Sequence, residues 1–299
     1  MSTPSVSEHE LLATPAHTRR RILTDRLAQW LLLLPFVAVL VPLGDMIYWI
    51  SERALPTMSW SVLTENQIGN SGGLHAMIIG TLTLIALSTA IATAVGILAG
   101  LYTAEYASPR VAQIGRTAGN VLAGIPAIVL GYFGYFLLVL YTGWGFTVLG
   151  GAITLSVLMV PFIYRTSDLA FSAVPATHRE AALALGSRRI QYLGRVAFPI
   201  ALPTILTGII LAMALGLGET APLIYTAGWS STPLTGLFSQ TSFLTGAIWL
   251  FYQQPAGLGT LLALAFQAAF MIMMIVIVVN VALQWVAEHY RRRLRGLLS

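Results

Sequence analysis

The sequence predicts an all-α integral membrane protein that crosses the lipid bilayer six times. Two observations carry this prediction. First, only 9% of the 299 residues are charged and 57% are hydrophobic, whereas a soluble domain carries about 25% charged residues. Second, the charges are grouped. The apolar stretches between them are long enough to cross a hydrocarbon core about 30 Å thick, which takes about 20 helical residues.

Five apolar stretches supply the six helices. The third stretch carries no charge over residues 117–164. As one helix it would extend about 70 Å, at about 1.5 Å per residue, so we expect it to cross twice. Thr142-Gly-Trp-Gly145 marks the turn between the two crossings. The stretches are residues 29–50, 76–104, 117–164, 200–225 and 260–285.

The placement of the arginines predicts which side each connection faces. With six helices, the N-terminal tail (residues 1–28), the second and fourth connections and the C-terminal tail (residues 286–299) lie on one side. Every arginine except Arg53 falls in these segments or at their borders. Cytoplasmic segments carry an excess of Lys and Arg, so both termini are predicted to be cytoplasmic, with a transmembrane domain at residues 29–285. This sidedness accounts for the net charge of +5, and we predict no binding of nucleic acid.

The composition excludes several kinds of chemistry. The chain has no cysteine and no lysine, which rules out disulfides, thiolate metal sites, Schiff bases and the lysine-containing phosphate-binding loop of ATPases. The five histidines are scattered without ligand spacing, so we predict no metal and no cofactor. A function that needs ATP would therefore depend on a separate subunit, and the chain itself is not expected to be an enzyme.

The connection at about residues 165–199 is predicted to fold into two short helices. Thr177 and Glu180 have the spacing of a capping box, which predicts a helix start. Gly186 predicts the end of this helix, because glycine readily adopts the left-handed conformation. Ser187 is then expected to cap a second helix that runs towards Pro199. The alanines and leucines of the first helix either bind a partner or pack beneath the protein's own bundle.

This connection resembles a known motif. Residues 180–186 read Glu-Ala-Ala-Leu-Ala-Leu-Gly and residues 196–199 read Val-Ala-Phe-Pro. The spacing is similar to that of the EAA loop of ATP-binding cassette (ABC) importer permeases, with Val and Phe as conservative departures. The resemblance implies a type I ABC-importer permease fold, in which this loop docks on the ATPase subunit. The coupling residues that it implies are Glu180, Ala181, Ala182 and Gly186.

A second resemblance narrows the family. Residues 218–223 read Gly-Glu-Thr-Ala-Pro-Leu, which is similar to the signature of PstA-type phosphate permeases, and the similarity extends from about residue 75 to the end of the chain. The resemblance implies a permease subunit of a phosphate importer in the bacterial inner membrane. The partners that it implies are a PstC-like second permease, a PstB-like ATPase dimer and a PstS-like external phosphate-binding protein.

The same segment supplies the candidates for a pathway or gate, which are Glu219, Thr220, Pro222 and, at the end of the fourth helix, Arg165. A carboxylate at mid-membrane costs about 3 kcal/mol and normally faces a cavity or a partner. Glu219 is therefore interpreted as a pathway residue or as a structural acid, and Arg165 as a pathway cation or as a topology signal. PstA-type permeases commonly carry an intramembrane arginine where this chain has Leu215. The partner permease is then the expected source of the positive charge.

Glycines and prolines predict where the helices break and pack. Gly218 and Pro222 predict a broken fifth helix, and Gly124-Ile-Pro126 predicts the same in the third. Gly96 and Gly100 form a GxxxG face that favours close packing within the subunit. Residues 243–251 are too short to span and are expected to form a helix on the external side.

Two other functions are compatible with parts of this pattern. A permease for another oxyanion, such as molybdate, sulfate or phosphonate, would share the EAA loop, although the segment at residues 218–223 counts against it. A proton-coupled secondary transporter would work without an ATPase. It would need a chain of ionisable residues within the membrane to relay the ion. The acidic candidates are one mid-membrane glutamate and Asp45 at the membrane border, which makes such a relay less favoured.

Overall fold

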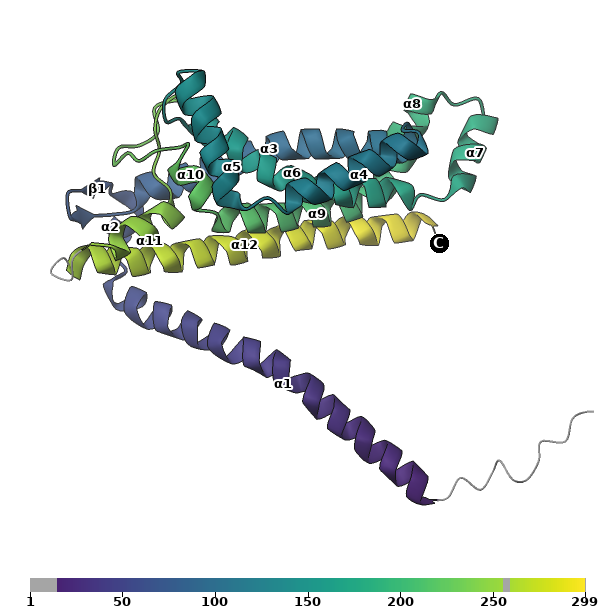
Figure 1. The fold of residues 1–299 in the computed structure, drawn as a ribbon, viewed down its shortest axis with the longest axis horizontal. Helices are drawn as coiled ribbons and strands as arrows, with labels where there is room; N and C mark the ends of the chain where they lie inside the picture. The colour runs from purple at the N-terminus through teal and green to yellow at the C-terminus, as the bar shows by residue number, and fades with distance from the viewer. Residues whose placement is uncertain (1–14, 255–258, 299) are drawn as a thin grey trace, which may run out of the picture. The chain divides into compact units, whose positions relative to one another are not determined.

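The computed structural model describes residues 15–254 and 259–298. The chain forms two compact units, Met1–Glu52 and Arg53–Ser299. The first unit holds most of helix α1 (Pro15–Ala54), a 40-residue helix that contains two prolines. The second unit holds all the other elements (Figure 1).

The predicted spans are present as helices. Within the described residues, five helices are long and apolar enough to cross a membrane. A sixth span consists of two helical segments that meet at an angle of 94° across a short break. With the bent pair counted as one span, the described residues contain six candidate spans, the number that the sequence predicts. The five helices are α1, α3 (His75–Glu105), α6 (Val148–Ser172), α9 (Phe198–Gly218) and α12 (Gly259–Leu298).

The bent span consists of α4 (Pro109–Ala123), α5 (Ala127–Gly134) and the π-helical segment η3 (Tyr135–Tyr141). Its break at residues 124–126 lies where glycine and proline predict it, because proline has no N–H to continue the backbone ladder. The turn predicted after η3 is also present, with Gly143 and Gly145 at φ +71° and +70°.

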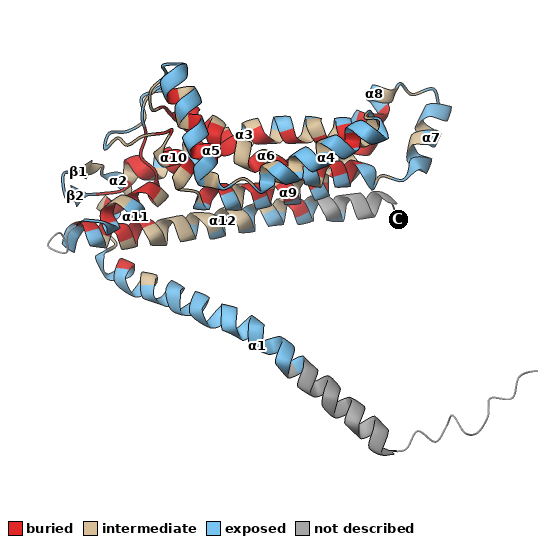
Figure 2. Ribbon diagram, in the orientation of Figure 1, coloured by how far each residue is buried: buried red, intermediate tan, exposed pale blue. Residues whose placement is uncertain are grey.

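The core of the second unit lies where α3, α6 and α9 meet, and its buried residues concentrate there (Figure 2). The GxxxG face packs within the subunit, as predicted. A methyl group added to Gly96 would lie 2.8 Å from Cβ of Ile163, and one added to Gly100 would lie 2.6 Å from Cβ of Ser167. Both neighbours belong to α6, so the two glycines let the α3 and α6 backbones approach closely.

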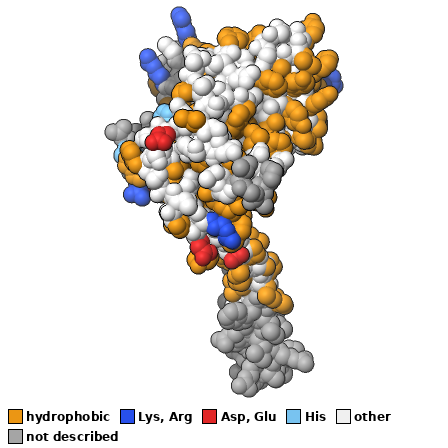
Figure 3. All heavy atoms as spheres, turned by 90° about the vertical axis from the view of Figure 1, so that its left-hand side faces the viewer, with side chains coloured by type: hydrophobic (Ala, Val, Ile, Leu, Met, Phe, Trp, Pro, Cys, Tyr) orange, Lys and Arg blue, Asp and Glu red, His pale blue; other side chains and the backbone are white. Residues whose placement is uncertain are grey.

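Short elements occupy the ends of the bundle. At one end lie η2 (Leu55–Thr57), α2 (Trp60–Thr64), a two-residue hairpin of β1 (Gln67–Ile68) and β2 (Ser71–Gly72), and α11 (Leu244–Tyr252). The view onto this end shows few charged side chains (Figure 3). The helix predicted at residues 243–251 is thus present as α11, which packs against α12 and α3. At the other end lie α7 (Ala176–Ala184), α8 (Arg189–Tyr192) and the π-helical segment η4 (Leu193–Ala197).

Three helices run beyond the apolar stretches that predict them. The fourth span continues as α6 to Ser172 instead of ending near Arg165. Helix α12 continues through the predicted C-terminal tail to Leu298, and α1 begins at Pro15, ahead of the apolar stretch at residue 29. These helices extend because charged residues at the ends of an apolar stretch end the hydrophobic span but not the backbone hydrogen bonding. Residues 1–14 of the predicted N-terminal tail lie outside the described residues.

Candidate functional site

The connection between α6 and α9 is built around Gly186. This residue has φ +78°, in the left-handed region. The N–H groups of Gly186 and Ser187 donate to the carbonyl oxygens of Leu183 and Ala182 at 3.0 and 3.1 Å. These two bonds form a Schellman motif, which ends α7. The predicted role of Gly186 as the stop of the first helix is confirmed.

Both predicted helix caps in this connection are wrong. Helix α7 begins after Pro175, so Thr177 lies inside the helix and its hydroxyl caps nothing. Pro175 is the N-cap residue, with ψ 136° outside the helical range, and the helical backbone starts at Ala176, so Thr177 is already past the capping position. Helix α8 begins after Arg188 and not after Ser187. The N–H of Arg188 donates to Oε1 of Gln191 at 2.8 Å.

The connection presents an exposed surface with apolar tips. None of the residues of α7 is buried. Glu180 and Ala181 are exposed, whereas Ala182 is half-buried against the cluster that contains Tyr192. Two large apolar side chains stand out, because Leu185 is 86% exposed and Ile190 is 72% exposed. Apolar side chains held outward on an ordered surface are typical of a binding site for another protein.

The base of the connection is tied to the end of α3 by charge. The carboxylate of Glu105, the last residue of α3, is 8% exposed. Its Oε2 atom lies 3.7 Å from Nη1 of Arg179 in α7 and 3.8 Å from Nη2 of Arg189 in α8. The guanidinium of Arg189 also donates to the backbone carbonyl of Glu105 and lies 4.0 Å from the centre of the Tyr106 ring.

Glu219 lies in the break of the fifth span. Helix α9 ends at Gly218, the backbone of Glu219 is extended, and a short helix α10 (Ala221–Ile224) follows. The predicted break is therefore present. The carbonyl oxygen of Glu219 accepts a hydrogen bond from Oγ1 of Thr245 in α11 at 2.8 Å. Among the described residues, no basic side chain forms an ion pair with Glu219.

The surroundings of Glu219 and Thr220 differ. Glu219 is half-buried and borders a void of about 10 Å³ towards the core, which is at the lower limit for one water molecule. Thr220 borders an open cavity of about 500 Å³ together with Trp249 and Gln253. Adjacent residues of this segment therefore face different spaces.

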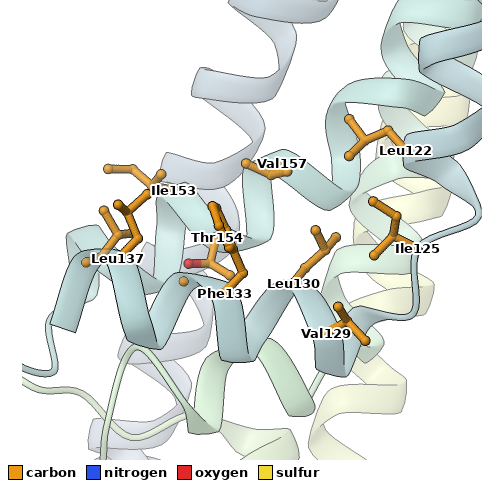
Figure 4. A pocket seen from close by; sticks show the side chains of 11 residues that line it. Leu122, Ile125, Val129, Leu130, Phe133, Leu137, Ile153, Thr154 and Val157 are labelled. Carbon is orange, nitrogen blue, oxygen red and sulfur yellow. The ribbon is translucent and has the colours of Figure 1, made fainter. Parts of the chain in front are cut away.

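The two broken spans meet. A methyl group added to Gly131 of α5 would lie 2.7 Å from Cα of Pro222 in α10, so the backbones are in contact at this point. Beside α5 lies an apolar cavity of about 410 Å³, bounded by the α4–α5 bend and by α6 (Figure 4). The residues that line this cavity carry no charge, so it is not a candidate binding site for an anion. The side chains labelled around it are Leu122, Ile125, Val129, Leu130, Phe133, Leu137, Ile153, Thr154 and Val157.

A polar cavity of about 430 Å³ contains Arg165. Asp168, whose side chain is 7% exposed, accepts two hydrogen bonds from Arg116, from Nε at 2.7 Å and from Nη2 at 3.1 Å. Such a bidentate pair fixes α4 against α6. Arg165 is exposed at this cavity and forms no ion pair with any residue of the described part of the chain.

The sequence interpretation missed Glu105 and Asp168. Asp168 lies 52 positions from Arg116, and Arg116 was interpreted only as a topology signal. A usable signal was present, because Asp168 is a carboxylate next to an apolar stretch, and such a group requires a partner. The structure does not bring Arg165 and Glu219 to a common cavity.

The fold defines a class of protein. The crystal structure of a bacterial alginate ABC transporter in complex with its alginate pentasaccharide-bound periplasmic protein matches with a TM-score of 0.64 at 17% identity. The match covers 92% of this chain and 97% of that one. The MetNI methionine ABC transporter matches with a TM-score of 0.55 at 16% identity, over 73% and 97%. The chain has the fold of an ABC-importer permease.

The family is established by sequence. The model of the binding-protein-dependent transport system inner membrane components matches residues 96–296, and the chain belongs to this family. It is 44% identical to the phosphate transport system permease protein PstA 2 of Mycobacterium bovis over 73% of both chains. It is 36% identical to PstA of Haemophilus influenzae over 60% of this chain and 65% of that one. The predicted resemblance to PstA-type permeases is confirmed.

Proposed function

We propose that this protein is the permease subunit of an ATP-driven importer of inorganic phosphate in the bacterial inner membrane. The observation that carries the proposal is the 44% identity to a phosphate permease over 73% of the chain. Residues 218–223, which extend across the break from α9 into α10, carry the Gly-Glu-Thr-Ala-Pro-Leu sequence that resembles this group. A second, PstC-like permease would complete the pathway, and a PstS-like external protein would deliver the phosphate.

Coupling to a PstB-like ATPase dimer is assigned to the connection between α6 and α9. The turn at Gly186 holds α7 and α8 at an angle, and Leu185 and Ile190 project from them. These exposed apolar side chains supply the surface for a groove on the ATPase, with Glu180 and Ala181 exposed beside them. Burial of two such side chains contributes about 1.5–3 kcal/mol each. The half-buried Ala182 anchors the other face of α7.

The pathway is assigned to the break of the fifth span and to the polar cavity near the loop. Glu219 directly follows α9, Thr220 borders an open cavity, and Pro222 of α10 contacts α5. Arg165 carries a positive charge without a described acidic partner, and this favours interaction with an anion. Position 215 is Leu in this chain, whereas PstA-type permeases commonly have an arginine there. In this proposal the second permease supplies the positive charge that faces the anion near Glu219.

The arginine distribution supports a cytoplasmic location for both termini. The C-terminal end of α12 and the α7–α8 connection lie at the same end of the second unit (Figure 1). Reporter fusions after Ser108, Ala173 and Ser299 are expected to read cytoplasmic, and fusions near Gly143 and Thr232 external. A cytoplasmic signal at Thr232 would contradict the six-span topology.

The test of the function is purification from membranes followed by reconstitution. An ATPase and a second permease are expected to copurify. In proteoliposomes that contain this assembly, the phosphate-loaded external protein is expected to stimulate ATP hydrolysis. Stimulation by sulfate or molybdate instead of phosphate would assign another oxyanion. Phosphate uptake that follows a proton gradient without ATP would assign a secondary transporter.

A further inference from the structure

The geometry at the end of α3 points to a residue that ties the coupling connection to the membrane helices. We infer that Glu105 is a positioning residue: its carboxylate clamps α7 and α8 to α3, and α3 carries their movement to the break at Glu219. This inference rests on the proposed coupling to an ATPase. It assigns a role to a charge that neither the EAA segment nor the pathway segment contains.

The first step is the clamp itself. Arg179 belongs to α7 and Arg189 to α8, and both face the same buried oxygen of Glu105. Both arginine side chains are about two-fifths exposed, whereas the carboxylate is 8% exposed. Arg189 also bonds the last carbonyl of α3, where the helix dipole concentrates negative charge. One carboxylate thus holds two helices that otherwise carry few buried side chains.

The second step concerns the distances. Oε2 of Glu105 is buried and accepts no hydrogen bond among the described residues, although two cationic nitrogens lie 3.7 and 3.8 Å away. A charge-assisted hydrogen bond in proteins is about 2.7–2.9 Å long. The contacts can therefore shorten by close to 1 Å on either side. A shift of α7 would change the Arg179 contact and a shift of α8 would change the Arg189 contact, so the carboxylate senses the movement of both helices.

The third step is the route along α3. This helix has 31 residues, which is about 45 Å at about 1.5 Å per residue. Near its other end, the Thr81 hydroxyl accepts a hydrogen bond from the N–H of Leu244 at 2.9 Å. The next residue of α11, Thr245, donates to the carbonyl oxygen of Glu219. Packed helices and hydrogen bonds therefore join Glu105 to the broken segment without a gap.

The test uses Glu105→Gln in the complete transporter. The amide keeps the size of the side chain and removes the charge that both arginines face. We expect ATP hydrolysis stimulated by the phosphate-loaded external protein to fall about tenfold, because a buried charge partner is lost. The amount of ATPase that copurifies is expected to stay within about twofold of wild type, since the exposed tips of the loop are unchanged. Glu288→Gln is the matched control, because it removes an exposed ion pair with Arg292 on α12.

Arg179→Gln separates a positioning role from general damage. It should lower coupling in the same direction, and the double variant with Glu105→Gln should be no worse than Glu105→Gln alone, because the residues act as one unit. Additive losses, or a loss of copurifying ATPase that matches the loss of activity, would overturn the inference. Wild-type coupling in Glu105→Gln would overturn it as well.

A second measurement needs no partner and therefore separates this inference from the proposed function. The chain has no cysteine, so Leu185→Cys supplies one site for a spin label, at a side chain that is 86% exposed. In the purified chain, Glu105→Gln is expected to increase the mobility of this label about twofold, as the ion pairs that restrain the loop are lost. Unchanged mobility would refute the clamp even if the ATPase binds as proposed.

Discussion

Gly186→Leu tests whether the angle between α7 and α8 matters for transport. Gly186 has φ +78°, and a side chain at this position meets no atom within 4 Å. The substitution therefore creates no clash, and its cost is that of the left-handed backbone, about 1–2 kcal/mol for a residue with a Cβ atom. This energy corresponds to a factor of about 5–30 in the population of the native turn. Phosphate uptake should fall by a similar factor if the turn must form before the ATPase docks.

The assay is uptake of phosphate into membrane vesicles, normalised to the amount of inserted protein. Gly194→Leu is the matched control, because Gly194 lies in the same connection, has no atom within 4 Å and does not have a positive φ. Gly186→Asn should retain more uptake than Gly186→Leu, since asparagine tolerates the left-handed region. Equal losses at positions 186 and 194, or wild-type uptake by Gly186→Leu, would refute the reasoning.

Three further predictions concern the membrane helices. Asp168→Asn should lower the free energy of unfolding in detergent by about 1–3 kcal/mol, because Arg116 loses its partner. This range lies between the values for exposed and buried ion pairs. Thermal unfolding measures the effect, and an unchanged melting temperature would contradict the prediction. Gly100→Ala should lower the melting temperature, because its methyl group would lie 2.6 Å from Cβ of Ser167 and overpacking costs about 1–3 kcal/mol. Glu219→Gln should assemble fully and change phosphate uptake if Glu219 lines the pathway. Wild-type uptake would end that assignment.

Local chemistry explains what the sequence predicted well. Apolar length determined the spans, and glycine or proline determined the breaks, because both effects act within a few residues of the chain. The turn at Gly186 and the break after Gly218 were predicted for this reason and are present. The N-cap assigned to Thr177 is wrong, because the N-cap of α7 is Pro175, two residues earlier in the chain.

The charges show where local reasoning ends. The rule that cytoplasmic segments are rich in arginine explains every arginine of the chain except Arg53 by membrane topology alone. It therefore does not indicate which arginines form ion pairs or hydrogen bonds within the protein. Arg116 nevertheless pairs with Asp168, 52 residues away, and Arg189 bonds the backbone of Glu105, 84 residues away. These pairings depend on how α3, α4 and α6 pack, and that packing depends on glycines whose partners the sequence does not specify.

The distribution of charge within the membrane domain has a consequence for anion transport. Asp168 neutralises Arg116, which leaves Arg165 as the cation without a described acidic partner in the polar cavity. At the break of the fifth span the balance is reversed, because Glu219 has no basic partner among the described residues. An anion that passed this chain alone would meet repulsion at Glu219 before attraction at Arg165. If the chain transports phosphate as proposed, we expect the proposed second permease to contribute positive charge near Glu219, and the pathway would then belong to the pair of permeases.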